Sequence, residues 1–130
     1  MITLRLDTRS GLAPYLQLVQ QVKHALRLGM LEVGDQLPTI KRVVTELAIN
    51  PNTVLKAYRE LEYEGLIESR PGQGTFITKT LAGPSLKSQA ALRRSLVRWL
   101  KEAHEAGLDE ESIEALFQDA LHQALKGGVA

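Results

Sequence analysis

The chain has 130 residues, which is enough for one domain or for one small domain with an appendage. It is 44% hydrophobic and 24% charged, an ordinary composition that excludes disordered, fibrous and membrane-embedded classes. There is no cysteine, which excludes disulfides, zinc fingers, iron–sulfur clusters and thiol nucleophiles, and the net charge of +1 argues against a general coat for nucleic acid.

The first segment is short and alternating. Residues 2–6 alternate between apolar and polar side chains, which predicts a short strand or an extended arm. The start of the chain has no apolar run before a small-residue cleavage site, so it is not a secretory signal. The charge-free stretch 10–22 is too short and too polar to span a membrane. We therefore expect a cytoplasmic protein with no membrane partner.

A first helix is predicted from Pro14 to Gly29. Proline is favoured in the first turn of a helix, and glycine commonly ends one. The apolar residues between them recur at spacings of four, three and four, which places them on one helical face: Tyr15, Val19, Val22 and Leu26.

Two further helices follow at close spacing. Thr39 can cap a helix that runs to about Leu47. After the short link 48–49, Asn50 followed by Pro51 is a strong start signal for the next helix, which runs to about Tyr63. Residues 66–70 and 75–79 are then predicted as two strands joined by a glycine-rich turn.

Two more helices are predicted after a linker at 81–86. One covers about 85–106, and the other is capped by Asp109 and ends at Gly127-Gly128. The order of elements predicts a mainly α fold with a small β-wing, in which a winged helix-turn-helix domain (1–80) precedes a two-helix C-terminal dimerisation tail (81–130).

The winged region carries a distinctive set of motifs. These are residues 34–38 (GDQLP), 50–54 (NPNTV), 64–67 (EGLI) and 70–76 (RPGQGTF), with Pro14-Tyr15 and Gln17 upstream. In this order they resemble the YtrA-type branch of the GntR family of transcription regulators. The resemblance implies a homodimeric DNA-binding regulator, a repressor of a neighbouring transporter-type operon. Leu55 stands where other branches often carry arginine, so base specificity does not transfer from them.

The candidate DNA-binding residues lie on the helix that begins after Asn50, on the helix before it and in the glycine-rich wing. The N-terminal part of a recognition helix enters the major groove, so Asn52, Thr53 and Lys56 are the candidates for base edges. Lys41 aligns with a family arginine that contacts DNA, and lysine keeps the charge without the bidentate fork. The full set is Thr39, Lys41, Arg42, Asn50, Asn52, Thr53, Lys56, Arg59, Arg70, Gly72, Gln73 and Gly74.

Alternatives stay open for several of these residues. Asn50 could be a helix cap without a DNA contact, and Arg70 could only protect a strand edge from pairing. Lys56 and Arg59 could be ordinary solvated residues. At the level of the whole chain, the alternative function is a winged-helix adaptor that binds proteins and not DNA.

The tail is expected to form a homodimer, because two isolated helices cannot bury both of their apolar stripes. The candidate interface residues are Leu92, Leu96, Trp99, Leu100, Ile113, Leu116, Phe117, Leu121 and Leu125. A dimer would match palindromic half-sites about 34 Å apart, or a multiple of that distance. The alternative is that the tail packs only on its own winged domain. A small-molecule effector of unknown identity could bind at the interface.

No enzyme or metal site is expected. The histidines, His24, His104 and His122, have no partner at a strong ligand spacing, and no cofactor motif is present. The basic residues around Arg94 and Arg98 are expected to be solvated or paired with the acidic run 109–114. Residues 37–59 carry four cations against Glu46 alone, so the cationic footprint is small and two copies should be needed for tight binding.

Overall fold

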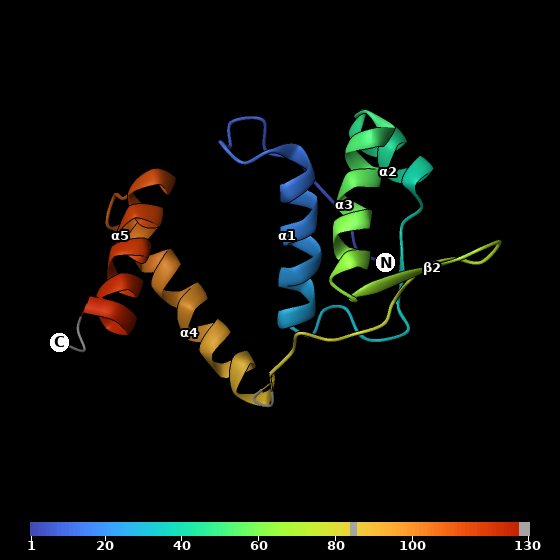
Figure 1. Ribbon diagram of the computed structural model, residues 1–130. Coiled ribbons are helices and arrows are strands. Elements are labelled where there is room, and N and C mark those ends of the chain that lie inside the picture. Colours follow the sequence, from blue (N-terminus) through green and yellow to red (C-terminus); the bar gives the residue numbers. More distant parts are fainter. Residues whose placement is uncertain (84–85, 128–130) are drawn as a thin grey trace. The chain divides into compact units, whose positions relative to one another are not determined.

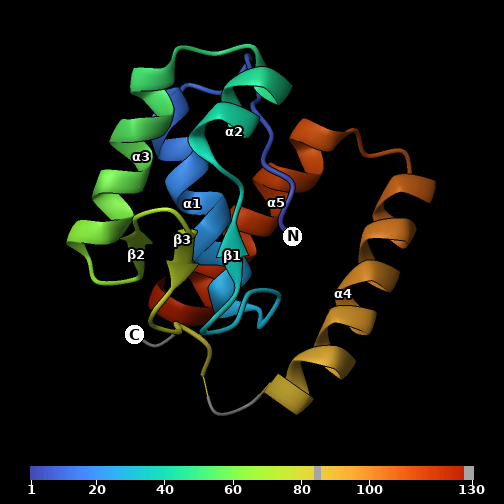
Figure 2. The ribbon, with the colours of Figure 1, turned by 90° about the vertical axis from the view of Figure 1, so that its right-hand side faces the viewer.

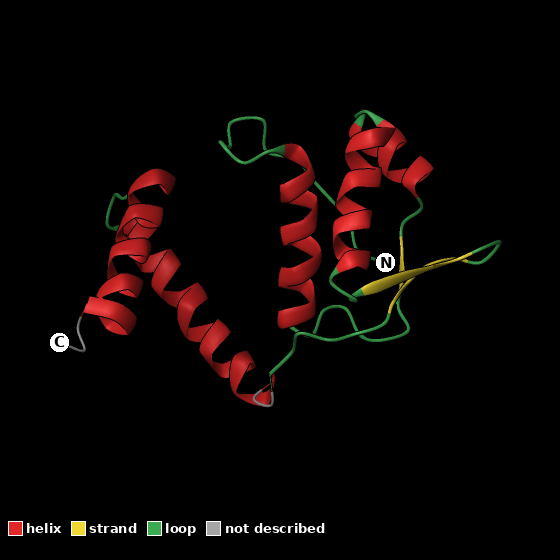
Figure 3. Ribbon diagram, viewed as in Figure 1, coloured by secondary structure: helices red, strands yellow, loops and turns green. Residues whose placement is uncertain are grey.

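The computed structural model describes residues 1–83 and 86–127 and divides into two compact units, Met1–Leu86 and Lys87–Ala130. The first unit holds α1 (Pro14–Arg27), β1 (Gln36–Leu37), α2 (Ile40–Leu47), α3 (Pro51–Tyr63), β2 (Ile67–Arg70) and β3 (Gly74–Ile77). The tail holds α4 (Leu86–Glu105), α5 (Glu110–His122) and a final π-helical turn (Gln123–Gly127). The mainly helical fold with a small wing, predicted from the sequence, is confirmed (Figure 3).

The predicted helix caps are present. Thr39 Oγ1 accepts a hydrogen bond from the Arg42 amide (3.1 Å), and Asn50 Oδ1 accepts one from the Asn52 amide (2.8 Å). In the tail, Asp109 accepts a hydrogen bond from the Ser112 amide (2.8 Å), and hydrogen bonds from the side chain and then the backbone of Ser112 lower the pKa of this carboxyl. Each cap satisfies an amide that has no partner within its own helix, which fixes where the helix begins.

The link between α2 and α3 contains one residue in the left-handed backbone conformation. Ala48, the C-cap of α2, has φ 52° and ψ 47°, and it is the non-glycine residue with positive φ in the part of the chain that the structure describes. This conformation ends α2 abruptly and lets Asn50 start α3 two residues later. The helices α2 and α3 and their short link therefore form a helix-turn-helix. α3 also lies beside α1 (Figure 1).

The wing is part of a three-stranded antiparallel sheet, whereas the sequence predicts only a hairpin. The strand order is β1-β3-β2, and Figure 2 shows the three strands side by side. β2 pairs with β3 from Ile67↔Ile77 to Arg70↔Gly74, while β1 pairs Gln36 with Phe76 on the other edge. β1 covers the edge of β3 that the hairpin alone would leave open.

Residues 2–6 form an arm without strand pairing, which is the second of the two predicted forms. Two glutamines of α1 hold the arm in place of a partner strand. Gln21 accepts from the Arg5 amide (2.9 Å) and donates to the Arg5 carbonyl (2.6 Å). Gln17 does the same for Asp7 and also donates to the Leu12 carbonyl.

The remaining differences lie at the ends of elements. α1 ends at Arg27, two residues before the predicted stop at Gly29, and α5 continues as a π-helical turn to Gly127. Ser85 and Gly128, predicted at the start of the fourth helix and after the fifth, lie outside the described residues.

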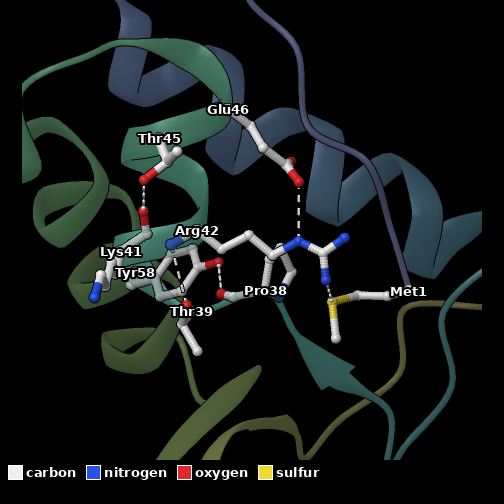
Figure 4. Close-up of polar contacts among 8 residues, drawn as sticks. All are labelled: Met1, Pro38, Thr39, Lys41, Arg42, Thr45, Glu46 and Tyr58. Carbon is white, nitrogen blue, oxygen red and sulfur yellow. Dashed lines mark hydrogen bonds and ion pairs between the residues drawn. The ribbon is translucent and has the colours of Figure 1, made fainter.

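The core of the first unit joins all three helices to the sheet. Its largest fully buried side chains are Leu18, Val22, Leu26, Leu37, Val43, Val54, Leu61 and Ile77. Tyr58 also belongs to this core, as the sequence predicts, and its hydroxyl donates to the Pro38 carbonyl (2.5 Å; Figure 4). This bond joins α3 to the residue before the Thr39 cap, so it holds the recognition helix against the start of α2.

Burial raises the pKa of the Tyr58 phenol well above its usual value. The neutral form stabilises the fold, so this contribution is complete below about pH 10, the unfolded value, and is lost as pH rises further. We expect Tyr58→Phe to lower the free energy of unfolding by about 1–2 kcal/mol at about pH 7, because the Pro38 carbonyl loses its donor. The same variant should lose less stability than the wild type above about pH 10.

Urea unfolding at about pH 7 and about pH 11 measures both effects. Tyr63→Phe is the matched control, because the Tyr63 side chain is 89% exposed. This substitution should change neither the free energy of unfolding at about pH 7 nor its loss at about pH 11. Equal alkaline losses in the wild type and in Tyr58→Phe would contradict the role given to the buried phenol.

Candidate nucleic-acid interface

The outward face of α3 is polar and open. Asn52, Lys56 and Arg59 are exposed along it, while Val54, Ala57, Tyr58 and Leu61 on the opposite face are buried. A shallow groove runs along the open face and is lined by Asn52, Leu55, Lys56, Arg59, Glu60 and Tyr63. The face that helical periodicity selects for reading bases is therefore open to solvent.

The two caps have their side-chain oxygens engaged. Each of them accepts a hydrogen bond from a backbone amide through its side-chain oxygen, and this leaves the Thr39 hydroxyl proton and the Asn50 side-chain NH2 as donors for a phosphate. Their observed role is to start α2 and α3, and a DNA contact by Asn50 stays a prediction. Backbone amides at these helix starts can still bind a phosphate oxygen.

Arg42 is held by an acidic neighbour. Its Nε donates to Glu46 (2.9 Å), one turn further along α2, and its Nη1 lies 3.4 Å from the Met1 sulfur (Figure 4). Lys41, next to it, points away from this pair in the close-up, and its ammonium has no partner among the residues that the structure describes. Of the two cations on α2, Lys41 is therefore the one free to meet a phosphate.

Arg70, at the base of the wing, is also held. Its Nε donates to Glu68 (2.7 Å), and its guanidinium carbon lies 4.5 Å from the centre of the Phe76 ring. Glu68 and Arg70 share one face of β2, and Phe76 is the residue paired with Glu68 across the ladder. The arginine is thus fixed on the sheet surface beside the wing turn.

The turn between β2 and β3 forms the tip of the wing. Gly72 and Gly74 have φ of 75° and 127°, values that favour glycine. A Cβ on Gly74 would overlap the Gln36 side chain, whose amide donates to the Gln73 carbonyl (3.3 Å). β1 therefore supports the wing tip from one side.

Lys56 contacts an aromatic ring on another helix. Its ammonium lies 4.1 Å from the centre of the Tyr15 ring, in the first turn of α1. Arg59, one turn beyond Lys56, has no partner for its guanidinium among the described residues. The sequence identifies these cations but not their partners. The Arg42–Glu46 spacing on a helix and the Glu68–Arg70 spacing on a strand could have been read from the chain, whereas the aromatic partners could not.

We expect Glu68→Gln to strengthen non-specific DNA binding about threefold, because Arg70 then no longer has to give up its ion pair with Glu68 when it contacts a phosphate. Stability should change by less than about 1 kcal/mol, since the pair is exposed. Titration of a random-sequence duplex at two salt concentrations measures this. Glu32→Gln removes the same charge at a residue that forms no ion pair within the described part of the chain, so an equal gain in that control would contradict the local explanation.

The predicted tail interface is exposed. The side chains 37–68% exposed are Leu92, Leu96, Leu100, Leu116, Phe117, Leu121 and Leu125, while Trp99 and Ile113 are half-buried. α5 has no buried residue. The cations Arg93, Arg94, Arg98 and Lys101 form a basic stripe on α4, and no ion pair within the described residues joins them to 109–114.

Across residues 1–83 and 86–127, no group of three or more histidines and carboxylates is placed to hold a metal ion. Within the same ranges, no helix has both the length and the apolar content needed to cross a membrane.

Comparison with known proteins decides the family. The sequence profile described as "Bacterial regulatory proteins, gntR family" matches residues 14–77. The HTH-type transcriptional repressor YtrA of Bacillus subtilis (strain 168) is 33% identical over 126 residues, which are 96% of each chain. The chain belongs to the GntR family. This GntR-family protein is therefore a transcription regulator with a DNA-binding winged helix, and not an enzyme.

Solved structures agree with this assignment. A transcriptional antiterminator from Listeria monocytogenes EGD-e is 33% identical, with a TM-score of 0.56 over 92% of this GntR-family chain and 89% of the other. YtrA from Sulfolobus acidocaldarius, a GntR-family transcription factor, is 28% identical, with a TM-score of 0.52 over 73% of this chain and 94% of its own. The predicted resemblance to the YtrA-type branch is confirmed.

Proposed function

We propose that the chain is a homodimeric repressor that binds a palindromic operator of a neighbouring transporter-type operon. The observation that carries the proposal is the open polar face of α3 beside a wing whose cation is already fixed in place. The relative from Bacillus subtilis, similar over nearly its whole length, is named a repressor, which supports the sign of regulation.

In this proposal the first unit, with residues 1–80, binds DNA. The helix that begins at Asn50 enters the major groove, with Asn52, Thr53 and Lys56 nearest the base edges. Residues 70–75 of the wing contact the flanking groove, where glycines let the backbone approach closely. Lys41 and Arg59, the cations without intramolecular partners among the described residues, contact phosphates.

Residues 81–130 form the dimer interface in this proposal. The support is the apolar surface of α4 and α5, which these two helices leave exposed. An effector that acts through this interface remains an expectation, and a compound that lowers the dimer's affinity for its operator would identify it.

Electrophoretic shift assays with Lys56→Ala and Arg70→Ala test the DNA contacts, on a duplex that the wild-type protein has selected from a randomised library. We expect Lys56→Ala to raise the Kd about tenfold on the selected duplex and less on a scrambled one, because it loses a base contact. Arg70→Ala should weaken binding to both duplexes similarly. The number of ions released on binding, measured from the salt dependence of the Kd, should fall by about one.

Lys23→Ala is the charge-matched control, because Lys23 pairs with Glu64 (2.8 Å) at the far end of α3 from the cap. Unchanged binding in both test variants would overturn the residue assignments. A wild-type protein that binds no duplex at low salt would favour the adaptor function instead.

A further inference from the structure

The contact between Lys56 and Tyr15 joins the recognition helix to α1. Lys56 is exposed on the open face of α3, and its ammonium lies 4.1 Å from the centre of the Tyr15 ring. Tyr15 is half-buried and packs against the core, so the ring is a fixed surface while the lysine chain is flexible. Among the described residues, the ammonium has no ion pair that could hold it elsewhere.

This arrangement matters because lysine specifies direction poorly. An ammonium is a point charge on a chain with several rotatable bonds, whereas the arginine common in this role has a rigid fork. An aromatic face restricts where the ammonium can lie, and it leaves the remaining N–H groups free to donate. A ring at this place can thus supply the orientation that the lysine itself lacks.

We propose that Tyr15 is a positioning residue for DNA reading, which holds the Lys56 ammonium at the α1 edge of α3 so that it meets one base edge, a guanine O6 or N7. The proposal rests on the function proposed above and adds a residue of α1 to the reading surface. Arg59, which has no such support among the described residues, makes the contrasting mobile contact with a phosphate. Specificity at one operator position then depends on a ring outside the recognition helix.

The test combines two substitutions of Tyr15 with one of Lys56. Tyr15→Phe keeps the ring, so its Kd for the selected duplex should stay within about twofold of the wild type. Tyr15→Leu removes the ring and should raise that Kd about two- to fivefold, the size of an exposed cation–π contact, without changing the Kd for a scrambled duplex. In a Lys56→Met background, Tyr15→Leu should have no further effect.

A second readout needs no DNA, and its main measurement uses the wild-type protein. In the free wild-type protein, the Lys56 protons next to the ammonium should be shifted upfield in the NMR spectrum by the ring current of Tyr15. Tyr15→Phe should keep this shift. An unshifted Lys56 in the wild type overturns the proposal, and so does an equal effect of Tyr15→Leu with and without Lys56. If the wild type does not discriminate between duplexes while the shift is present, the proposed function fails and the contact itself stands.

Discussion

A variant with glutamate at two apolar positions of α5, Phe117→Glu with Leu121→Glu, should bind a duplex with two half-sites at least about a hundredfold more weakly than the wild type. The two side chains are one turn apart on the same face and are 40% and 42% exposed. Placing two charges there opposes burial against a second copy, because each carboxylate would have to leave water. With one winged domain on each half-site, the loss of dimerisation removes the gain from linked binding.

The loss should be confined to linked binding. A duplex with one half-site should be bound equally by the variant and the wild type, since residues 117 and 121 lie outside the first unit. Light scattering should show a wild-type dimer and a monomeric variant. The matched control is Gln118→Glu with His122→Glu, which adds two glutamates one turn apart on the polar face of the same helix.

Two results would contradict this role for the tail. One is a wild-type monomer, which would favour the alternative that the tail packs on its own winged domain. The other is a double variant that stays dimeric and keeps its affinity for paired half-sites.

The helices of this fold were predictable because their start signals are local. Thr39, Asn50 and Asp109 each cap an amide two or three residues away, so the caps can be read from the sequence next to each start. Helical spacing likewise identified the outward face of α3 and the buried Tyr58. These features depend on contacts within one or two turns of the chain.

The features that escaped prediction depend on distant residues. β1 is two residues long and is a strand only because Gln36 and Leu37 pair with residues about forty positions later. The N-terminal arm has no strand partner because glutamine side chains of α1 take that place. No local pattern distinguishes such a segment from a loop.

The candidate site shows the same division. Sequence patterns identify which cations face outward, but the aromatic partners that restrain two of them are distant in the sequence. Tyr15 reaches Lys56 from another helix, and Phe76 reaches Arg70 from another strand. Whether a cation is free or held by a partner affects its contribution to DNA binding. The charge pattern therefore predicts where the protein contacts DNA but not how tightly it binds.

Gln17→Glu should lower the free energy of unfolding by about 3–5 kcal/mol at neutral pH, which is a large part of the stability of a small domain. Gln17 is 9% exposed, and its amide nitrogen donates to the carbonyls of Asp7 (3.1 Å) and Leu12 (2.9 Å). A carboxylate keeps the acceptor that the Asp7 amide needs (2.8 Å), but it faces both carbonyls with negative charge. Two partly buried acceptors then lose their donors.

The loss should depend on pH in a defined direction. The surrounding carbonyls favour the protonated form of the introduced carboxyl, which raises its folded pKa above the unfolded value of about 4.3. Its neutral form can donate one hydrogen bond, so the cost should be least below about pH 4 and should grow as pH rises through the folded pKa. Chemical unfolding at a series of pH values measures this.

Gln21→Glu is the internal control for this prediction. Gln21 makes the equivalent pair of bonds with Arg5 one turn later on α1, but those bonds are exposed to solvent. Water can replace the lost donor there, so the cost should be about 1 kcal/mol and nearly constant with pH. If the two variants lose equal stability, burial of the Gln17 amide does not explain how α1 holds the arm, and the hydrophobic contact of Leu4 with the core would have to explain it instead.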